Sequence, residues 1–276
     1  MVVPYKNQSK GKKEQVADMF NSISHKYDFL NHLLSGGIDI IWRKKAIKLL
    51  QNKGIKSVLD IATGTGDFAI EALKIKPEKI VGIDISEGML AFGVEKIKKL
   101  GLDNIITLQK GDSEKIPFSD NSFDAITVSF GVRNYETLDK GLKEMYRVLK
   151  PHGSLILSDP VCETPMPANL KNDQRLRALC LTGALPLATY IKRLTDIGFG
   201  TIEVRAKRPY RILSPRHYAT DHVIFVESVE ICAIKDPMPS DGPCVFTGKA
   251  AIYYGKEDYF DDKKGHTLLK NQPLAV

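Results

Sequence analysis

The chain has 276 residues, of which 43% are apolar and 26% charged, and its formal net charge is +7. These values are typical of a globular protein with one large α/β domain and an appendage, and they exclude a largely disordered chain. Because no apolar run approaches the roughly 18 residues of a transmembrane helix, and because MVVPYKNQSKGKK lacks the apolar centre of a signal peptide, we expect a soluble, cytoplasmic protein.

Two helices are predicted at the N-terminus. Apolar side chains recur at spacings of three and four from Phe20 to Leu34, which predicts an amphipathic helix that a pair of glycines ends. A second helix, carrying Trp42, is expected from Ile38 to Leu50. We therefore expect residues 1–52 to form capping helices, and the lysines at their start indicate a solvated tail rather than a nucleic-acid contact.

Strands alternate with helices between residues 53 and 160. Strands are predicted at 57–62, 79–84, 105–110, 123–130 and 154–159, and helices at 66–74, 87–100 and 136–150. Alternation at this spacing predicts parallel strand pairing in a doubly wound α/β sheet.

The alternation stops after Asp159. A proline-rich link over 161–170 is followed by two predicted helices and then by β-branched runs. The helices are expected at 176–183 and 188–197, and the runs lie at 201–210, 223–235 and 244–254. The polar–apolar alternation within the runs predicts antiparallel strands, so we expect residues 161–276 to form a smaller α+β segment.

The stretch VLDIATGTGDFA, residues 58–69, predicts a ligand site between a strand and a helix. Gly64 and Gly66 would let a ligand approach the main chain without a Cβ in the way, and the helix N-terminus behind them offers free N–H groups. A dinucleotide-binding fingerprint has a glycine or alanine at the position of Ala69. The spacing alone therefore does not exclude NAD as the ligand.

Acidic residues at the ends of three predicted strands favour a different ligand. Asp84 ends the second strand, where it can accept hydrogen bonds from two ribose hydroxyls. Asp60 lies where it could bind a cationic amino group, and Asp112 could contact an adenine amino group. A pyrophosphate gains nothing from these extra acids. Adenosine joined to a sulfonium amino acid gains from both, which indicates S-adenosylmethionine.

Residues 1 to about 153 resemble the UbiE/MenG family of quinone C-methyltransferases. The resemblance is carried by YDFLNHLLSGGIDIIWRKK, VLDIATGTGD, GIDISEGML, GDSEKIPFSDNSFDAITVSFGVRN and EMYRVLKPHG. It implies the Rossmann-like fold of class I S-adenosylmethionine-dependent methyltransferases, with residues 53–160 binding the cofactor. The implied cofactor contacts are Asp60, Gly64, Thr65, Gly66, Asp84, Met89, Asp112, Ser113 and Ser129.

The same resemblance implies an acceptor site. Arg133 and Asn134 of FGVRN would face the acceptor, with Asp67 as a possible helper, and the helix from Phe20 to Leu34 would cap the pocket. Arg133 could stabilise a developing phenolate as a fixed cation, or it could pair with a surface acid. His25 is a candidate base, although a structural role fits a histidine there better.

Residues 155–276 resemble a second family, the arsenite methyltransferases (ArsM). The carrying stretches are SDPVCETPMPANLKNDQRLRALCLTGALP, GFGTIEVRAKRPYRILSPRHY and AIKDPMPSDGPCVFTGKAAIYYGKEDYFDD. The resemblance implies arsenic(III) coordination by Cys180 and Cys244, with Cys162 as a third ligand, whereas Cys232 fits the core of an apolar strand. The chain has no CxxC pair, so no other metal site is predicted.

Three hypotheses about function follow. The favoured one is C-methylation of a prenylated quinol, either demethylmenaquinone or a ubiquinone precursor, because the capping helices, the glycine-rich loop and FGVRN form an intact block. It requires at most peripheral membrane contact. The alternatives are methylation of arsenite through cysteine thiolates, and cofactor binding without turnover.

Overall fold

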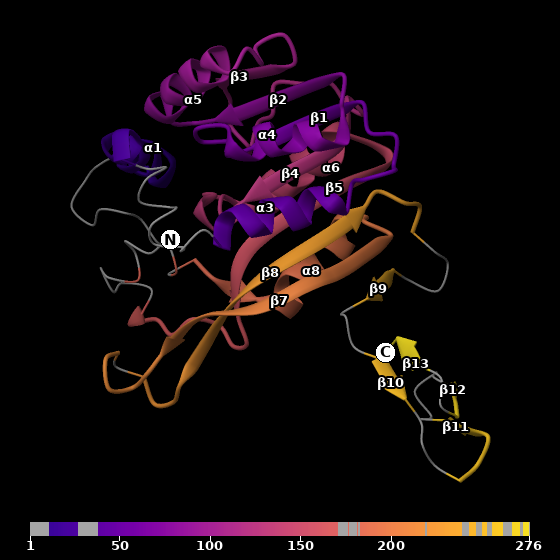
Figure 1. Ribbon diagram of the computed structural model, residues 1–276. Coiled ribbons are helices and arrows are strands. Elements are labelled where there is room, and N and C mark those ends of the chain that lie inside the picture. The colour runs from indigo at the N-terminus through magenta and orange to yellow at the C-terminus, as the bar shows by residue number, and fades with distance from the viewer. Residues whose placement is uncertain are drawn as a thin grey trace.

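A computed structural model describes most of the chain. The described residues are 11–26, 38–170, 176, 181, 183–218, 220–238, 243–246, 250–252, 256–261, 267–270 and 273–275. A nine-stranded sheet runs through them in the order β3-β2-β1-β4-β5-β8-β7-β9, with β6 paired to β5 beside this path. Figure 1 shows the sheet crossing the molecule, with helix α1 at one side and small C-terminal strands away from it.

The parallel half of the sheet carries the predicted strands. It consists of β1 (Ser57–Ile61), β2 (Lys79–Asp84), β3 (Ile106–Lys110), β4 (Phe123–Ser129) and β5 (Leu149–Cys162). Neighbours in the order β3-β2-β1-β4-β5 all pair in parallel. The strand order reverses at β1, and sheets of this kind bind ligands beside such a point, at the carboxyl ends of the strands. The predicted doubly wound, mostly parallel α/β sheet is confirmed.

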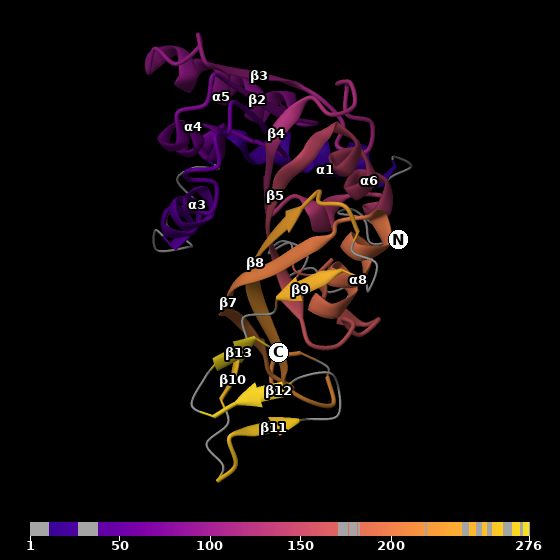
Figure 2. The same ribbon diagram turned by 90° about the vertical axis from the view of Figure 1, so that its right-hand side faces the viewer.

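Helices cover both faces of the sheet (Figure 2). One face carries α3 (Ile38–Lys48), α4 (Asp67–Ala72) and α5 (Glu87–Lys99), and the other carries α6 (Leu138–Val148) and α8 (Leu187–Ile197). The 3-10 turns η2 (Leu73–Ile75) and η3 (Val132–Asn134) follow α4 and β4. These helices lie where the hydrophobic periodicity predicted them, with ends shifted by a few residues.

Each face of the sheet has its own apolar core. Ala46 and Ile47 of α3 pack with Ile156 of β5 on one face. Leu142 of α6 and Tyr190 of α8 belong to the core of the other face. Because β1 is covered on both faces, its residues are almost all buried, which is why its sequence is a continuous apolar run rather than an alternating one.

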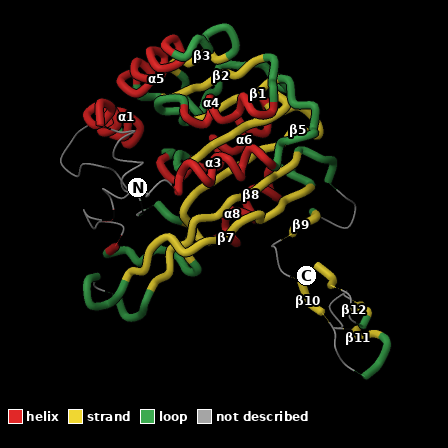
Figure 3. Tube along the Cα trace, in the orientation of Figure 1, coloured by secondary structure: helices red, strands yellow, loops and turns green. Residues whose placement is uncertain are grey.

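The C-terminal strands extend the same sheet. β7 (Thr201–Leu213) and β8 (Ile224–Ile234) pair antiparallel, as predicted, and β8 pairs antiparallel with β5. Figure 3 shows the paired ends of β7 and β8 reaching past the helices. Pairing with β8 supplies hydrogen bonds as far as Cys162, so β5 continues into the segment predicted as a proline-rich link. The predicted domain boundary between residues 160 and 161 stays a prediction, and strand β5 continues across this position.

The last predicted run was wrong in part. Of residues 244–254 the structure describes β9 (Cys244–Phe246) and β10 (Ala250–Ile252). β10 pairs antiparallel with the strand at Pro273–Ala275, as predicted, but β9 pairs with β7 in parallel. Alternation within a run fixes the side-chain faces but not the direction of the partner strand, which explains the error. The remaining short strands are β6 (Leu185–Pro186), β11 (Tyr259–Asp261), β12 (Thr267–Leu269) and β13 (Pro273–Ala275).

The N-terminal helix begins earlier than predicted. α1 spans Lys12–Ile23 and continues as the 3-10 turn η1 (Ser24–Lys26), whereas the periodicity predicted a helix from Phe20 to Leu34. Its first turn is polar and therefore carries no apolar pattern, although Glu14 there suits the positive end of the helix dipole. Residues 27–37 and most of the helix predicted at 176–183 lie outside the described residues. Among those described, no helix combines the length and apolar character needed to cross a membrane.

Candidate functional site

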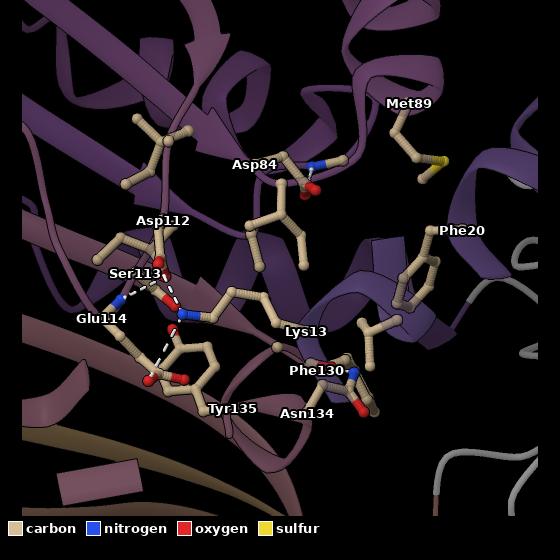
Figure 4. Close-up of a pocket in the computed structure, with 18 of the residues that line it drawn as sticks. Lys13, Phe20, Asp84, Met89, Asp112, Ser113, Glu114, Phe130, Asn134 and Tyr135 are labelled. Carbon is tan, nitrogen blue, oxygen red and sulfur yellow. Dashed lines mark hydrogen bonds and ion pairs between the residues drawn. The ribbon is translucent and has the colours of Figure 1, made fainter. Parts of the chain in front are cut away.

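A cavity lies at the carboxyl ends of the parallel strands, beneath α1. It encloses about 720 Å³ of empty space, part of it open to solvent. Its wall contains many of the predicted site residues: Gly64, Asp84, Met89, Asp112, Ser113, Ser129 and Asn134. Figure 4 shows Asp84, Met89, Asp112, Ser113 and Asn134 round this space. The structure therefore brings residues from the ends of four strands and from the FGVRN segment round one space. Their individual roles stay predictions.

Asp84 is held at the end of β2 by two backbone N–H groups. Its Oδ2 accepts a hydrogen bond from Gly64 N at 2.9 Å, and its Oδ1 accepts one from Ser86 N at 2.8 Å. Burial raises the pKa of Asp84, and the backbone N–H groups of Ser86, Gly64 and Ile85 partly offset this effect. A carboxylate has about four lone-pair positions, so both oxygens can still accept one further hydrogen bond each.

The glycine-rich turn adopts the backbone conformations for which its glycines are suited. Gly64 has a φ of 58° and Gly66 a φ of 84°, both in the left-handed region. A Cβ at Gly64 would lie 3.2 Å from Met89 Cε, at the cavity wall. Thr65 and Gly66 do not line the cavity, and Thr65 Oγ1 instead accepts a hydrogen bond from Lys96 Nζ at 3.2 Å.

Asp60 lies behind the turn rather than in the cavity wall. The side chain is 1% exposed, and its two oxygens accept hydrogen bonds from the hydroxyls of Thr63 at 2.6 Å and Thr127 at 2.7 Å. Burial raises the pKa of Asp60 to about 6. The hydrogen bonds from the two hydroxyls favour the charged form and therefore oppose this rise. This arrangement fixes the turn, while contact with a ligand amino group stays a prediction.

The raised pKa of Asp60 predicts a pH-dependent stability. Between pH 3.8 and about 6 the unfolded chain has released this proton and the folded protein has kept it, so the free energy of unfolding falls as the pH rises. A difference of about two pKa units corresponds to about 3 kcal/mol. We expect Asp60→Asn to make this decline smaller in urea unfolding measured from pH 4 to 7, because it removes the contribution of this carboxyl. An equal decline in Asp60→Asn and wild type would contradict the prediction.

Asp112 is occupied by a lysine that sequence reasoning missed. Lys13 of α1 crosses the cavity, and its Nζ lies 2.6 Å from Asp112 Oδ2 and 3.6 Å from Glu114 Oε2 (Figure 4). Asp112 Oδ1 accepts a hydrogen bond from Glu114 N at 2.9 Å. Burial lowers the pKa of Lys13, but the hydrogen bond to Asp112 and the negative charges of Asp112, Glu114 and Glu136 together outweigh this effect, and the pKa is raised. An adenine amino group would therefore share Asp112 with Lys13.

Hydrogen bonds fix α1 at both ends of the cavity. Asn21 Oδ1 accepts hydrogen bonds from Ser86 Oγ at 2.7 Å and from Gly88 N at 2.9 Å, at the start of α5. At the other end Lys12 Nζ donates to the backbone carbonyl of Tyr135. Phe20 of the same helix lines the cavity. α1 thus covers one side of the cavity, while the capping role predicted for residues 1–52 stays a prediction.

Arg133 and Asp67 do not belong to the cavity wall. Arg133 Nη1 lies 2.5 Å from Asp159 Oδ1, and the two side chains are 6% and 0% exposed. Asp159 also accepts a hydrogen bond from the Tyr190 hydroxyl at 2.6 Å. The partner of Arg133 is therefore a buried acid, not a surface acid. Asp67 forms ion pairs with Lys96 at 2.8 Å and Arg43 at 3.3 Å.

The loop after β4 is strained where it meets the glycine-rich turn. Phe130 has a φ of 56° and Ala62 a φ of 54°, although neither is glycine, and such residues cost of order 1–3 kcal/mol each. A Cβ at Gly131 would lie 2.6 Å from Ala62 Cβ, so the close approach of the two loops requires glycine there. Both strained residues line the cavity.

The structure does not assemble an arsenic site from the cysteines it describes. Cys162 is buried, with its Sγ 3.5 Å from the carbonyl oxygen of Ala184, and Cys232 lies in the core as predicted, where burial raises its pKa to about 11. Cys180 lies outside the described residues, and only the backbone of Cys244 is described. Within the described part of the chain, no three His, Cys, Asp or Glu side chains gather as metal ligands. His25 is exposed in η1, outside the cavity wall.

The ubiE/COQ5 methyltransferase family matches residues 7–170. The chain belongs to this family. A demethylmenaquinone methyltransferase from Bacteroides fragilis is 54% identical over 157 residues, which are 56% of this chain and 64% of that protein. The ubiquinone/menaquinone biosynthesis C-methyltransferase UbiE of Geobacter sulfurreducens is 45% identical over 148 residues, 53% of this chain and 58% of that protein. The chain therefore spans about three fifths of the length of these curated relatives.

A solved structure extends the likeness beyond the family match. CrArsM, an arsenic(III) S-adenosylmethionine methyltransferase from Chlamydomonas reinhardtii, is similar with a TM-score of 0.57 and 21% identity, over 80% of this chain and 78% of that one. At this identity the likeness shows the fold alone. Both predicted resemblances are confirmed, the first by family membership and the second at the level of the fold. Membership of a methyltransferase family agrees with the predicted methyltransferase activity, which stays a prediction for this chain.

Proposed function

We propose that the chain binds S-adenosylmethionine in the cavity and transfers its methyl group to a ring carbon of a prenylated quinol. The observation that carries this proposal is the carboxylate of Asp84, clamped by Gly64 N and Ser86 N at the edge of a cavity that continues to Phe130 and Asn134. The names of the family relatives support the quinol as acceptor, with demethylmenaquinone favoured over a ubiquinone precursor.

The residues of the cavity fit this cofactor. Asp84 retains acceptor positions for the two ribose hydroxyls, and the bare backbone of Gly64 leaves room beside it. Ile85 and Met89 line the same end and supply apolar contacts for a flat adenine. Ser113 and the shared carboxylate of Asp112 supply polar groups near the adenine edge. S-adenosylmethionine supplies an electrophilic methyl group on a positively charged sulfur.

The chain's own residues position the acceptor. Phe130 and Asn134 line the cavity beyond the strand ends, so a ring held there would lie next to the cofactor end. Arg133 supports Phe130, since its guanidinium lies 5.2 Å from the Phe130 ring centroid and is fixed by Asp159. Holding two reactants in an aligned geometry lowers a barrier by about 7–11 kcal/mol, and this is the main contribution that we assign to the site.

A methyl-transfer assay tests the proposal. Protein is incubated with S-adenosylmethionine labelled in its methyl group and, in parallel, with a dithionite-reduced 2-prenyl-1,4-naphthoquinone or with arsenite and a thiol. We expect label in the naphthoquinol and none in arsenic. Label in arsenic alone, or in neither acceptor, would overturn the proposed acceptor.

Asn134 provides a variant for the same assay. Asn134→Ala is expected to lower kcat/KM for the quinol by about 10–100-fold, because it removes a polar contact that lines the reacting end of the cavity. Asn104→Ala is the matched control, since Asn104 is exposed in the turn before β3. An equal effect of the two substitutions would argue against an acceptor at Asn134.

A further inference from the structure

Three aromatic side chains from distant parts of the chain meet beside the cavity. Phe130, in the cavity wall, stacks on Trp42 of α3, with ring centroids 5.3 Å apart and an interplanar angle of 17°. Tyr210 of β7 lies 6.3 Å from Trp42 and 6.2 Å from Phe130, measured between centroids. We call Phe130, Trp42 and Tyr210 the aromatic cluster. It joins the N-terminal helices, the loop after β4 and the C-terminal strands.

Each member of the aromatic cluster carries a feature that packing alone disfavours. Phe130 has its left-handed backbone, which bulky side chains avoid. Tyr210 stands in a β-bulge, since the register with β8 shifts between the residues on either side of it. Trp42 has its indole Nε1–H buried, and this donor lacks a hydrogen-bond partner among the described residues.

These features have a common meaning. Strained backbone persists mainly at functional sites, and bulges re-aim side chains beside active sites. A buried donor without an acceptor lowers stability unless a ligand supplies the acceptor. Their convergence on one cluster next to the cavity indicates a binding surface for a flat ligand that carries an oxygen.

The aromatic cluster also leads from the cavity to the surface. Trp42 is 8% exposed, whereas Tyr210 is 40% exposed. Ile41, next to Trp42 on α3, is also exposed, at 51%. An acceptor whose ring reacts in the cavity needs a surface for any apolar substituent that extends out of it, and the exposed Tyr210 ring, which lies beside Phe130, offers one.

We propose that the aromatic cluster is the binding site for the acceptor: Phe130 and Trp42 bind its ring, the Trp42 Nε1–H donates to a ring oxygen, and Tyr210 contacts the prenyl substituent where it leaves the cavity. This inference rests on the proposed function and specifies its acceptor as a prenylated aromatic diol. Tyr210 belongs to the segment outside the family match, so this part of the chain contributes directly to acceptor binding.

Trp42 is the chain's one tryptophan, which makes its fluorescence a direct reporter. Protein loaded with S-adenosylhomocysteine is titrated with the reduced 2-prenyl-1,4-naphthoquinone, and free N-acetyltryptophanamide serves as the control for absorption by the ligand. We expect saturable quenching beyond this control. Geranylgeraniol, which has a prenyl chain and no ring, should leave the fluorescence unchanged.

Two variants separate binding from folding. Tyr210→Leu is expected to raise the acceptor Kd in the quenching titration, and Trp42→Phe, which keeps a ring but removes the N–H, to raise the acceptor KM. Each increase should be about 5–10-fold, with the KM for S-adenosylmethionine unchanged. Tyr259→Leu is the matched control, since Tyr259 is 59% exposed on β11. A cluster that only stabilised the fold would lower the amount of active protein and therefore Vmax, and both KM values would stay unchanged.

The outcomes distinguish this inference from the proposed function. Methyl transfer to the quinol without saturable quenching, or with Tyr210→Leu indistinguishable from Tyr259→Leu, would overturn the inference and leave the function standing. Quenching that depends on Tyr210, without any methyl transfer, would support the binding site and overturn the function. Absence of both quenching and transfer would overturn both.

Discussion

Asp84→Asn is expected to weaken binding of S-adenosylhomocysteine by about 100-fold or more in calorimetry. The substitution removes a carboxylate whose free lone pairs would accept two ribose hydroxyls. Hydrogen bonds to a charged acceptor contribute about 1.5–3 kcal/mol each, and about 1.4 kcal/mol corresponds to a factor of ten in affinity. The asparagine NH₂ group would also face one of the N–H donors that clamp the native side chain, Gly64 N or Ser86 N.

Glu87→Gln is the control for this prediction. Glu87 also loses a negative charge and lies only three residues further along the chain, but its side chain is 70% exposed and paired with Lys110 on the surface. We expect its affinity for S-adenosylhomocysteine to stay within about twofold of wild type, because an exposed ion pair contributes little. Circular dichroism establishes that both variants are folded at the temperature of the titration. Similar affinities for the two variants would remove Asp84 from the cofactor site.

The cofactor half of the molecule could be predicted because its signals are local. Buried parallel strands appear as apolar runs, and the helices between them as stripes of period 3.6. The acids at the strand ends are then brought together by topology alone, since parallel strands place their carboxyl ends at one edge. Asp84 and Asp112 meet at the cavity for this reason.

The contacts that complete the site could not be predicted, because they join residues far apart in the sequence. Lys13 reaches Asp112 from a helix turn without apolar periodicity. Asp60 sits at a strand end like Asp84, yet Thr63 and Thr127 turn it inward, and the spacing of the acids holds no sign of this difference. The pairing of β8 with β5 likewise depends on a long-range choice of partner.

Arg133 illustrates the same limit in a functional motif. Its place in FGVRN suggested a cation aimed at the acceptor, because a motif specifies residue types and not the direction of a side chain. The structure fixes its guanidinium on Asp159, the residue at which the predicted alternation of strands and helices stops. Tyr190 of α8 holds the other carboxylate oxygen, so the pair connects the family motif with the C-terminal helices.

This buried pair predicts the largest loss of stability from a single substitution. Asp159→Ala should lower the free energy of unfolding by about 3–5 kcal/mol, measured by urea unfolding, because it leaves the Arg133 guanidinium buried without its partner. Burial raises the pKa of Asp159, and Arg133 opposes that shift, so each group depends on the other. Asp196→Ala breaks an exposed pair with Lys192 on α8 and should cost less than about 1 kcal/mol.

A double variant separates the loss of a charge from the loss of packing. Replacing both partners, as Arg133→Met with Asp159→Leu, removes the unpaired charge and should recover much of the stability lost in Asp159→Ala. It should not recover turnover, because Phe130 would still lack the cation that supports its ring at the cavity wall. A double variant as unstable as Asp159→Ala would show that apolar packing, rather than the buried charge, dominates here. Full turnover in the double variant would leave Arg133 without a part in the reaction.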